Sequence, residues 1–386
     1  MDRRSHPWSR TARLTLAVAL GVAALVGLVF AAGSNGVRDV ARADTTAAAA
    51  AAPAVGARSA ILIDRRTGKV LWSKSPDRRL APASCTKIMT ALLALEHYKN
   101  LSRYIRAPAS VASQPGAGIR LHVGDRITVR QALKALMVKS ANDAALTLAS
   151  AISGSESRFV RKMNRRAKKL GLTRTHFVNC RGKPVRGHYM SARDLAKLGR
   201  YAMRNARFRA IVDTQTAVIR WPPSHAVRVT SHNRLLDYPW GDGIKTGSTK
   251  ASKAVLAGSG RPGLVPLIVV TMREPTRARE VKDAVALLMW GSELYENRQI
   301  VAGGDAVKEL MVSGGDPVTA VAVADLTAVV RKAATVRLIF DLPAEPLATR
   351  PADGDPLGTV TYRSDGLVLG RVDLVAATLP AGFPSP

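Results

Sequence analysis

Hydrophobic residues recur every three or four positions in several stretches of the chain, and this spacing predicts helices with one buried face. The most complete stretch is residues 81–96, APASCTKIMTALLALE, where the apolar positions run from Ile88 to Leu95. Because Pro82 and Ser84 are typical of helix N-termini, we expect a buried helix that begins near Ser84. The same spacing predicts helices at about 129–140, 143–153, 157–170, 191–205 and 278–294.

Short apolar runs bounded by turn residues predict strands. Residues 59–64 and 69–72 flank a four-residue turn that ends in Gly68, which is a β-hairpin pattern. Three further runs lie between the helical stretches, at 227–230, 254–258 and 265–272. From about residue 298 only short strands are predicted, at 318–323, 335–340, 358–362, 367–369 and 372–376.

This order of elements predicts an α/β (α+β) domain over residues 58–297, in which helices pack on an antiparallel sheet, and a small all-β domain over residues 298–386. Residues 44–57 are rich in alanine and are expected to be a linker. Residues 379–386 contain three prolines, so no C-terminal membrane helix is expected.

Residues 1–43 have the pattern of an export signal. Four arginines occur among the first 13 residues, residues 14–32 carry no charge, and Ala41 and Ala43 fit a small-x-small cleavage site. The uncharged run is nearly long enough to span a bilayer, so a cleaved signal peptide and a retained N-terminal anchor both stay open. In either case we expect the protein on the extracytoplasmic face of the membrane, in the periplasm or in the cell wall.

The chain is strongly basic, with 58 Lys and Arg against 28 Asp and Glu and a formal net charge of +30. Nucleic acid is the usual partner for such a charge. Export argues against nucleic acid here, and the sequence has neither zinc-ligand spacing nor basic repeats interleaved with aromatic residues. We therefore expect no nucleic acid partner. An anionic cell envelope is the better candidate for the partner of the basic residues.

Two cysteines, Cys85 and Cys180, are present. A pair in an exported chain raises the prospect of a disulfide. Cys85 falls within the predicted buried helix, so we expect both cysteines to be small buried residues. No HExxH or CxxC motif occurs, and we expect neither a metal nor a cofactor.

Three short motifs follow one another along the chain. Ser84 and Lys87 lie three residues apart and share a helix face, although a lone Ser-x-x-Lys is usually a capping serine with a solvated lysine. Ser140-Ala141-Asn142 then separates two predicted helices, and Lys245-Thr246-Gly247 precedes Ser248. Ser-x-x-Lys, Ser-x-Asn and Lys-Thr-Gly in this order form the pattern of penicillin-binding proteins and related β-lactamases.

These residue types suit acyl transfer. Ser84 at a helix start can act as the nucleophile. Lys87 can act as its base only when neutral, and its reference pKa of about 10.4 must then be lowered by burial and by a nearby cation. Lys245 is the candidate cation.

The remaining motif residues have candidate roles in the same reaction. Asn142 can bind the Lys87 amine or the substrate amide, and Ser140 can pass a proton to the leaving nitrogen. Gly247 lets a substrate backbone come close to a strand edge. The backbone N–H groups of Ser84 and Ser248 are the candidate oxyanion donors.

Over about residues 59–291 the chain resembles the low-molecular-mass penicillin-binding proteins, which are serine-type D-alanyl-D-alanine carboxypeptidases. Besides the three motifs, the segments 177–179, 187–195 and 232–236 are similar to this family. The resemblance implies a transpeptidase fold, shared with β-lactamases, and removal of the terminal D-alanine from peptidoglycan stem pentapeptides. It also implies acylation by β-lactam antibiotics. Residues 353–360 are similar to the β-rich C-terminal domain of many members.

The family also implies an arginine before the closing helix that binds the substrate carboxylate. We expect Lys245, together with Thr246, to bind the same carboxylate. Here the register is off by one, because Glu280 falls at the matching position. The neighbouring Arg279 is therefore the expected carboxylate ligand. A second departure is Cys180-Arg181-Gly182-Lys183, which replaces a less charged loop.

Three other functions use overlapping features. A β-lactamase needs a second carboxylate to activate water, usually in a Glu-x-x-Leu-Asn loop, and no such segment lies between Ser140 and Lys245. A DD-endopeptidase that cuts peptidoglycan cross-links fits the same motifs and stays open. A non-catalytic envelope-binding protein fits the high charge, but it should have lost the nucleophile or its lysine, and both are present.

Overall fold

The computed structural model describes residues 51–378. The expected export signal at 1–43, the first part of the alanine-rich linker and residues 379–386 lie outside the described residues. No helix within 51–378 is both long enough and apolar enough to cross a membrane. The described end of the linker joins the fold before Arg58, since Val55 and Ala57 are buried.

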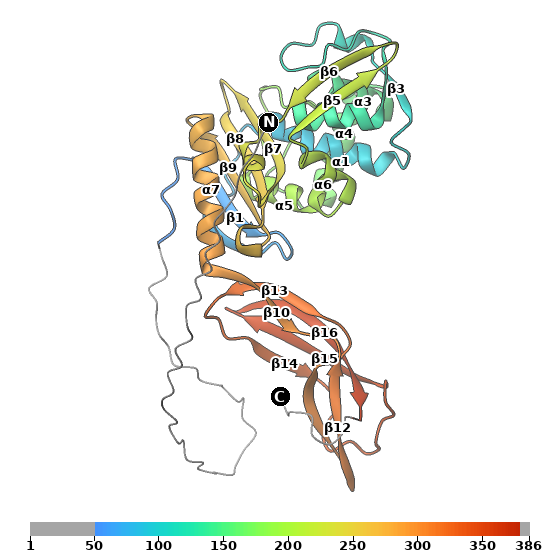
Figure 1. The fold of residues 1–386 in the computed structure, drawn as a ribbon, viewed down its shortest axis with the longest axis vertical. Coiled ribbons are helices and arrows are strands. Elements are labelled where there is room, and N and C mark those ends of the chain that lie inside the picture. The colour runs from blue at the N-terminus through green and yellow to red at the C-terminus, as the bar shows by residue number, and fades with distance from the viewer. Residues whose placement is uncertain (1–50, 379–386) are drawn as a thin grey trace, which may run out of the picture. The chain divides into compact units, whose positions relative to one another are not determined.

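A five-stranded antiparallel sheet organises the first domain (Figure 1), with the order β2-β1-β9-β8-β7. Its strands are β1 (Ser59–Asp64), β2 (Val70–Lys74), β7 (Gly241–Thr249), β8 (Lys253–Gly260) and β9 (Leu267–Glu274). The predicted N-terminal hairpin therefore pairs directly with a strand from the far end of the domain, Ser59 opposite Met272. Most residues of β1, β8 and β9 are buried, as expected for strands covered on both faces.

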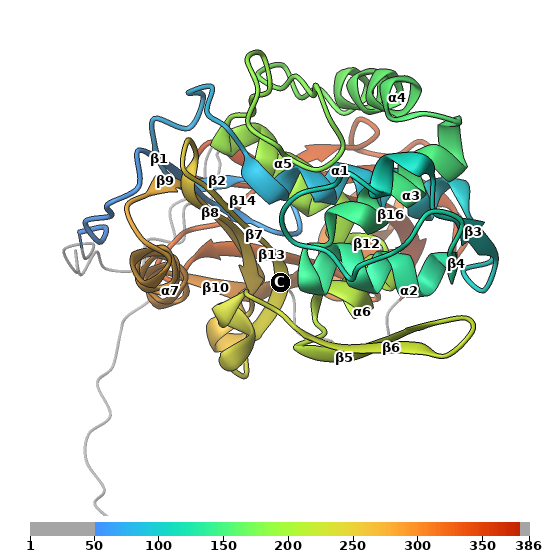
Figure 2. The same ribbon diagram turned by 90° about the horizontal axis from the view of Figure 1, so that it is seen from above.

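The alternation of side chains along β1 divides the core into two layers. Ile61 and Ile63 belong to a cluster that includes helix α1 (Lys87–His97). Ala60 and Leu62 belong to a second cluster with residues of α7 (Arg277–Leu294). Successive strand residues point to opposite faces, so the sheet separates α7 from the other helices (Figure 2).

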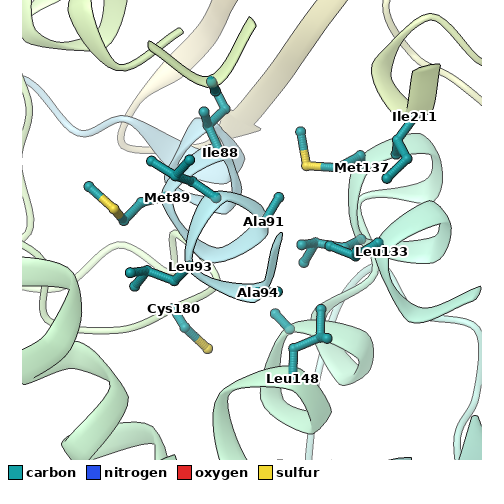
Figure 3. Packing of buried hydrophobic residues seen from close by; sticks show 14 of the residues in the cluster. Ile88, Met89, Ala91, Leu93, Ala94, Leu133, Met137, Leu148, Cys180 and Ile211 are labelled. Carbon is teal, nitrogen blue, oxygen red and sulfur yellow. The ribbon is translucent and has the colours of Figure 1, made fainter. Parts of the chain in front are cut away.

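Helix α1 is buried on all sides. Every residue from Lys87 to Leu95 is buried, and side chains from several other segments surround it, including Leu133, Leu148 and Ile211 (Figure 3). A helix that is apolar all round belongs in the middle of a domain. The surrounding helices are α2 (Val129–Lys134), α3 (Asn142–Ser153), α4 (Glu156–Lys169), α5 (Ala192–Met203) and α6 (Ala206–Val212).

Two small hairpins complete the first domain, and the second domain has its own core. The hairpins are β3 (Tyr104–Arg106) with β4 (Arg126–Thr128) and β5 (Thr216–Trp221) with β6 (His225–Thr230).

The second domain consists of β10 (Tyr295–Val301), β11 (Ala306–Val312), β12 (Gly315–Ala322), β13 (Leu326–Arg331), β14 (Arg337–Asp341), β15 (Pro356–Ser364) and β16 (Leu367–Ala377). β10 pairs with β13, and the other five strands form an antiparallel sheet around Leu310, Val360 and Leu374.

Most predicted elements are confirmed, with three kinds of difference. The stretch predicted as one helix over 129–140 ends as α2 at Lys134, continues as a π turn over Ala135–Lys139, and places Ser140 at a φ of 65°. The two short strands predicted at 367–376 are one strand, β16. The elements that were not predicted are short or carry polar or glycine residues among the apolar ones: α6, β3, β4, β5, β7, β10, β11 and β13.

Leu133 is fully buried in the first core, whereas Leu264 is 80% exposed. Leu133→Ala should lower the free energy of unfolding by about 2–5 kcal/mol, because it removes packed atoms and leaves a cavity. The matched change Leu264→Ala should shift it by less than about 0.5 kcal/mol. Denaturant unfolding followed by circular dichroism measures both values. Similar losses in the two variants would contradict the assignment of this core.

Candidate active site

The backbone around Ser84 is held between a loop and a strand. Ser84 lies in a 3₁₀ turn, Ala83–Thr86, that leads into α1. A Cβ atom on Gly247 would lie 2.7 Å from the Ser84 nitrogen, and one on Gly182 would lie 1.8 Å from the Ala83 oxygen. Only glycine permits these approaches. The strand that carries the third motif therefore contacts the backbone of the first motif. The loop around Gly182, which belongs to none of the motifs, contacts it as well.

The Lys87 amine joins the first two motifs. Lys87 is 0% exposed, and its Nζ donates hydrogen bonds to Ser84 Oγ at 3.1 Å, Asn142 Oδ1 at 2.8 Å and the Arg181 main-chain oxygen at 2.7 Å. An ammonium group has three donors, and each has an acceptor here. This geometry places a candidate base against the candidate nucleophile.

The electrostatic setting of Lys87 matches the sequence expectation. Burial, and next the charge of Lys245, lower the pKa of Lys87 to about 7. About half of the amines are then neutral near pH 7 and able to accept a proton. Burial also lowers the pKa of Lys245, to about 8, and its Nζ donates to the Thr246 oxygen at 2.7 Å. Lys245 thus stays largely cationic near neutral pH.

The second motif projects from the irregular end of a helix. Ser140 follows the π turn with left-handed backbone geometry and is 7% exposed. Asn142 begins α3, where its backbone N–H donates to the Ala117 oxygen at 2.7 Å and its Nδ2 to the Pro115 oxygen at 3.1 Å. These contacts leave Asn142 Oδ1 directed at Lys87.

A cleft of about 330 Å³ lies over these groups, and its lining includes seven of the residues predicted for the site: Ser84, Ser140, Asn142, Lys245, Thr246, Gly247 and Ser248. Lys87 is not part of the lining but is hydrogen-bonded to Ser84, which is. The lining also holds residues that the motifs did not identify: Gln114, Arg181, Lys183, His232 and Arg277. Four lining residues are cationic by type, namely Arg181, Lys183, Lys245 and Arg277, and among residues 51–378 no carboxylate lines the cleft. Such a cleft favours an anionic ligand.

The structure places Arg277 at the cleft, and the expected carboxylate ligand Arg279 outside its lining. Arg277 lines the cleft, whereas the Arg279 side chain is 56% exposed, and its Nε lies 3.9 Å from Asp283 Oδ2. Residues two apart on a helix point roughly 200° away from each other. Glu280, one turn after Arg277, is buried, and burial raises its pKa to about 7. The sequence match could not decide which side of the first turn faces the cleft.

Neither cysteine forms a disulfide, and both are buried. The Cys85 thiol donates to the Lys245 oxygen at 3.3 Å, and the Cys180 thiol to Glu156 Oε1 at 3.2 Å. Burial raises the pKa of Cys85 to about 12 and that of Cys180 well above its usual value. Both are therefore poor nucleophiles. Within residues 51–378, no group of three His, Cys, Asp or Glu side chains could hold a metal ion.

Comparisons with known proteins agree with one another. Residues 46–276 match the family model described as D-alanyl-D-alanine carboxypeptidase. The chain is 33% identical to D-alanyl-D-alanine carboxypeptidase DacF of Bacillus subtilis over 330 residues, 83% of this chain and 85% of that protein. Identity to DacC of Escherichia coli is 32%, over 64% of this chain and 63% of that protein.

Two solved structures share the fold. Penicillin-binding protein 5 of Haemophilus influenzae superposes with a TM-score of 0.69 and 27% identity, over 84% of this chain and 98% of that one. A mutant of the Streptomyces K15 DD-transpeptidase gives a TM-score of 0.59 and 30% identity, over 63% of this chain and all of that one. The antiparallel sheet with packed helices and the β-rich second part are thus features of a known fold.

Lys245→Ala should move the acidic limb of the Ser84 acylation rate to higher pH. The charge of Lys245 lowers the pKa of Lys87, so its removal raises that pKa and the neutral amine forms only at higher pH. Pre-steady-state acylation by a fluorescent penicillin, measured across pH, gives the limb directly. An unmoved limb in this variant would show that Lys245 has no part in tuning Lys87.

Proposed function

The chain belongs to the D-alanyl-D-alanine carboxypeptidase family and is a serine DD-carboxypeptidase; we propose that it removes the terminal D-alanine of peptidoglycan stem pentapeptides through an acyl-enzyme on Ser84. The observation that carries this assignment is the Lys87 amine at 3.1 Å from Ser84 Oγ, with a pKa lowered to about 7. The lowered pKa is what the base of an activated serine requires.

The proposed reaction has two halves. Ser84 Oγ attacks the carbonyl of the penultimate D-alanine while its proton passes to Lys87 Nζ. Ser140 gives a proton to the leaving nitrogen and takes up in exchange the proton that Lys87 gained, and free D-alanine departs as the ester on Ser84 forms. Water then attacks this ester and gives a proton to Lys87 Nζ, which passes it to Ser84 Oγ as the shortened peptide leaves, so that the serine and the neutral amine are both restored. The N–H groups of Ser84 and Ser248 are the proposed oxyanion donors in both halves.

We propose Lys245, Thr246 and Arg277 as the groups that bind the terminal carboxylate of the substrate. All three line the cleft, and an arginine fork suits a carboxylate. Gly247 follows Thr246 on β7 and also lines the cleft, where it is the proposed residue beside which the substrate backbone lies. Arg277 thereby takes the role that the sequence gave to Arg279.

The proposed location is extracytoplasmic, because peptidoglycan is assembled outside the membrane and residues 1–43 have an export pattern. Whether those residues are cleaved or anchor the protein is a separate question for N-terminal sequencing. β-lactam antibiotics are the proposed inhibitors, and the anionic envelope is the proposed partner of the +30 charge. Nucleic acid is not a proposed partner.

We propose that the catalytic part ends at Leu294. The boundary expected at 297 falls inside β10, which pairs with β13 of the second domain. A cut after α7 leaves that pairing within one domain. The four segments then are the export signal, the alanine-rich linker, the catalytic domain and the β-rich domain.

Incubation of the purified protein with a muropeptide pentapeptide should release one D-alanine, detected as the corresponding mass loss. Ser84→Ala should abolish this release and also the covalent attachment of penicillin, because no other serine contacts Lys87 in the described residues. Cleavage of cross-linked dimers in place of pentapeptides would indicate an endopeptidase. A penicillin adduct on another residue, such as Cys85, would refute the assignment of Ser84.

Arg277→Ala should raise KM for the pentapeptide about tenfold or more, because it removes a charge-assisted contact with the terminal carboxylate. Arg279→Ala is the matched control, since that side chain is outside the cleft, and its KM should change less than twofold. A peptide amide that lacks the carboxylate should be hydrolysed equally by wild type and Arg277→Ala. A larger effect in Arg279→Ala would reverse the assignment.

A further inference from the structure

The loop between α4 and α5 supplies one of the three acceptors for Lys87. It is tied by Asn179, whose Oδ1 accepts hydrogen bonds from the backbone N–H groups of Arg181 at 3.2 Å, Gly182 at 2.7 Å and Lys183 at 2.9 Å. This turn directs the Arg181 main-chain oxygen at Lys87 Nζ, 2.7 Å away. The position of this oxygen depends on how firmly residue 181 is held.

The Arg181 side chain is held by a carboxylate at the start of α4. Arg181 Nε lies 3.2 Å from Glu156 Oε1 and Nη2 lies 3.0 Å from Oε2, a two-pronged ion pair. Glu156 Oε1 also accepts the Cys180 backbone N–H at 3.0 Å. Arg181 Nη1 reaches Gln114 in the loop that forms another part of the cleft lining. Glu156 therefore forms hydrogen bonds with two successive residues of the loop, Cys180 and Arg181.

We propose that Glu156 is a positioning residue for the acylation step, because it holds Arg181 so that the Arg181 carbonyl fixes the Lys87 amine beside Ser84. This inference rests on the proposed function of Lys87 as base. Glu156 does not line the cleft and acts through the loop, by its contacts with Arg181 and with the Cys180 backbone N–H.

The chemistry explains why a carbonyl is useful there. A carbonyl oxygen accepts hydrogen bonds and cannot donate, so it remains a partner for Lys87 both before and after the amine takes the serine proton. A two-pronged pair between arginine and carboxylate is the side-chain contact that best fixes orientation. A misplacement of about 1 Å in a catalytic group can lower the rate about a hundredfold.

Glu156 also pairs with Arg181, one of the charged groups that act on the base. The charged or ionisable groups that act on Lys87 are Lys245 on β7, Arg181 and Cys180 on the loop, and Cys85 beside Ser84. Lys245 and Arg181 lower the pKa of Lys87. Loss of the Glu156 charge leaves Arg181 unbalanced and loosens the carbonyl that stabilises the ammonium form. Both effects lower the pKa of Lys87 further.

A close match to this ion pair occurs away from the cleft. Glu96 Oε1 accepts from Arg166 Nε at 3.1 Å and from Arg166 Nη2 at 2.6 Å. The exposures of the two pairs are similar, 26% for Glu156 with 17% for Arg181 against 34% for Glu96 with 21% for Arg166. Glu96→Gln is therefore the control for the loss of an arginine–carboxylate pair as such.

The test is the rate of Ser84 acylation by a fluorescent penicillin, measured across pH in the full chain. Glu156→Gln should lower the plateau rate about tenfold and move the acidic limb to lower pH. Glu96→Gln should leave both unchanged, with a similar loss of thermal stability. Glu156→Asp, which keeps the charge but is shorter, should recover most of the limb position and part of the rate.

Several results would overturn the proposal. An unchanged rate and limb in Glu156→Gln would do so, and so would a lower rate with an unmoved limb, because that pattern indicates a structural role only. Equal changes in Glu96→Gln would have the same meaning. If the wild-type protein itself is not acylated, the function of Ser84 and Lys87 fails before Glu156 is tested.

Discussion

A lysine amine buried at the start of an apolar helix is the constraint on which this structure depends. Lys87 is 0% exposed, and the residues of α1 that follow it are buried as far as Leu95. A buried amine without partners is costly, whether charged or neutral. Its three acceptors come from the 3₁₀ turn before its helix, from the start of α3 and from the loop before α5. Satisfying one nitrogen therefore fixes the relative positions of three segments that are distant in sequence.

The same constraint explains the close packing around Ser84. The loop that brings the Arg181 oxygen to Lys87 must pass against the backbone of Ala83, and β7 must pass against that of Ser84. Side chains at Gly182 and Gly247 would occupy those contacts. The glycine of the third motif thus has a packing role. Its place in the motif follows from the distance between β7 and the start of α1.

Sequence reasoning identified what depends on residue type and on periodicity. The buried helix, the hairpin, the later strands and the three motifs each have a local signature, and the motif residues meet at one cleft. Sequence reasoning named Arg279 and did not consider Arg277, because the direction of the first turn of α7 is left undetermined by sequence spacing. The contact between Lys87 and the Arg181 main-chain oxygen could not be predicted, because every residue type has such an oxygen. The unusual charge of residues 180–183 was the one feature of the sequence that set this loop apart. The position of Ser140 required a π turn that periodicity treats as ordinary helix.

The distribution of charge around the cleft follows from these contacts. Its lining offers cations to a ligand and no carboxylate, while Glu156 and Glu280 lie outside the lining. Glu156 pairs with Arg181, and the charge of Glu280 raises the pKa of Lys245. Burial raises the pKa of Glu280 itself to about 7, so its charge, and with it this support for the cationic form of Lys245, increases as the pH rises through neutrality. Lys245 in turn lowers the pKa of Lys87. The pKa of Lys87 is thus set by nearby charged groups. Two carboxylates outside the cleft lining, Glu156 and Glu280, act on the cations Arg181 and Lys245, which line the cleft.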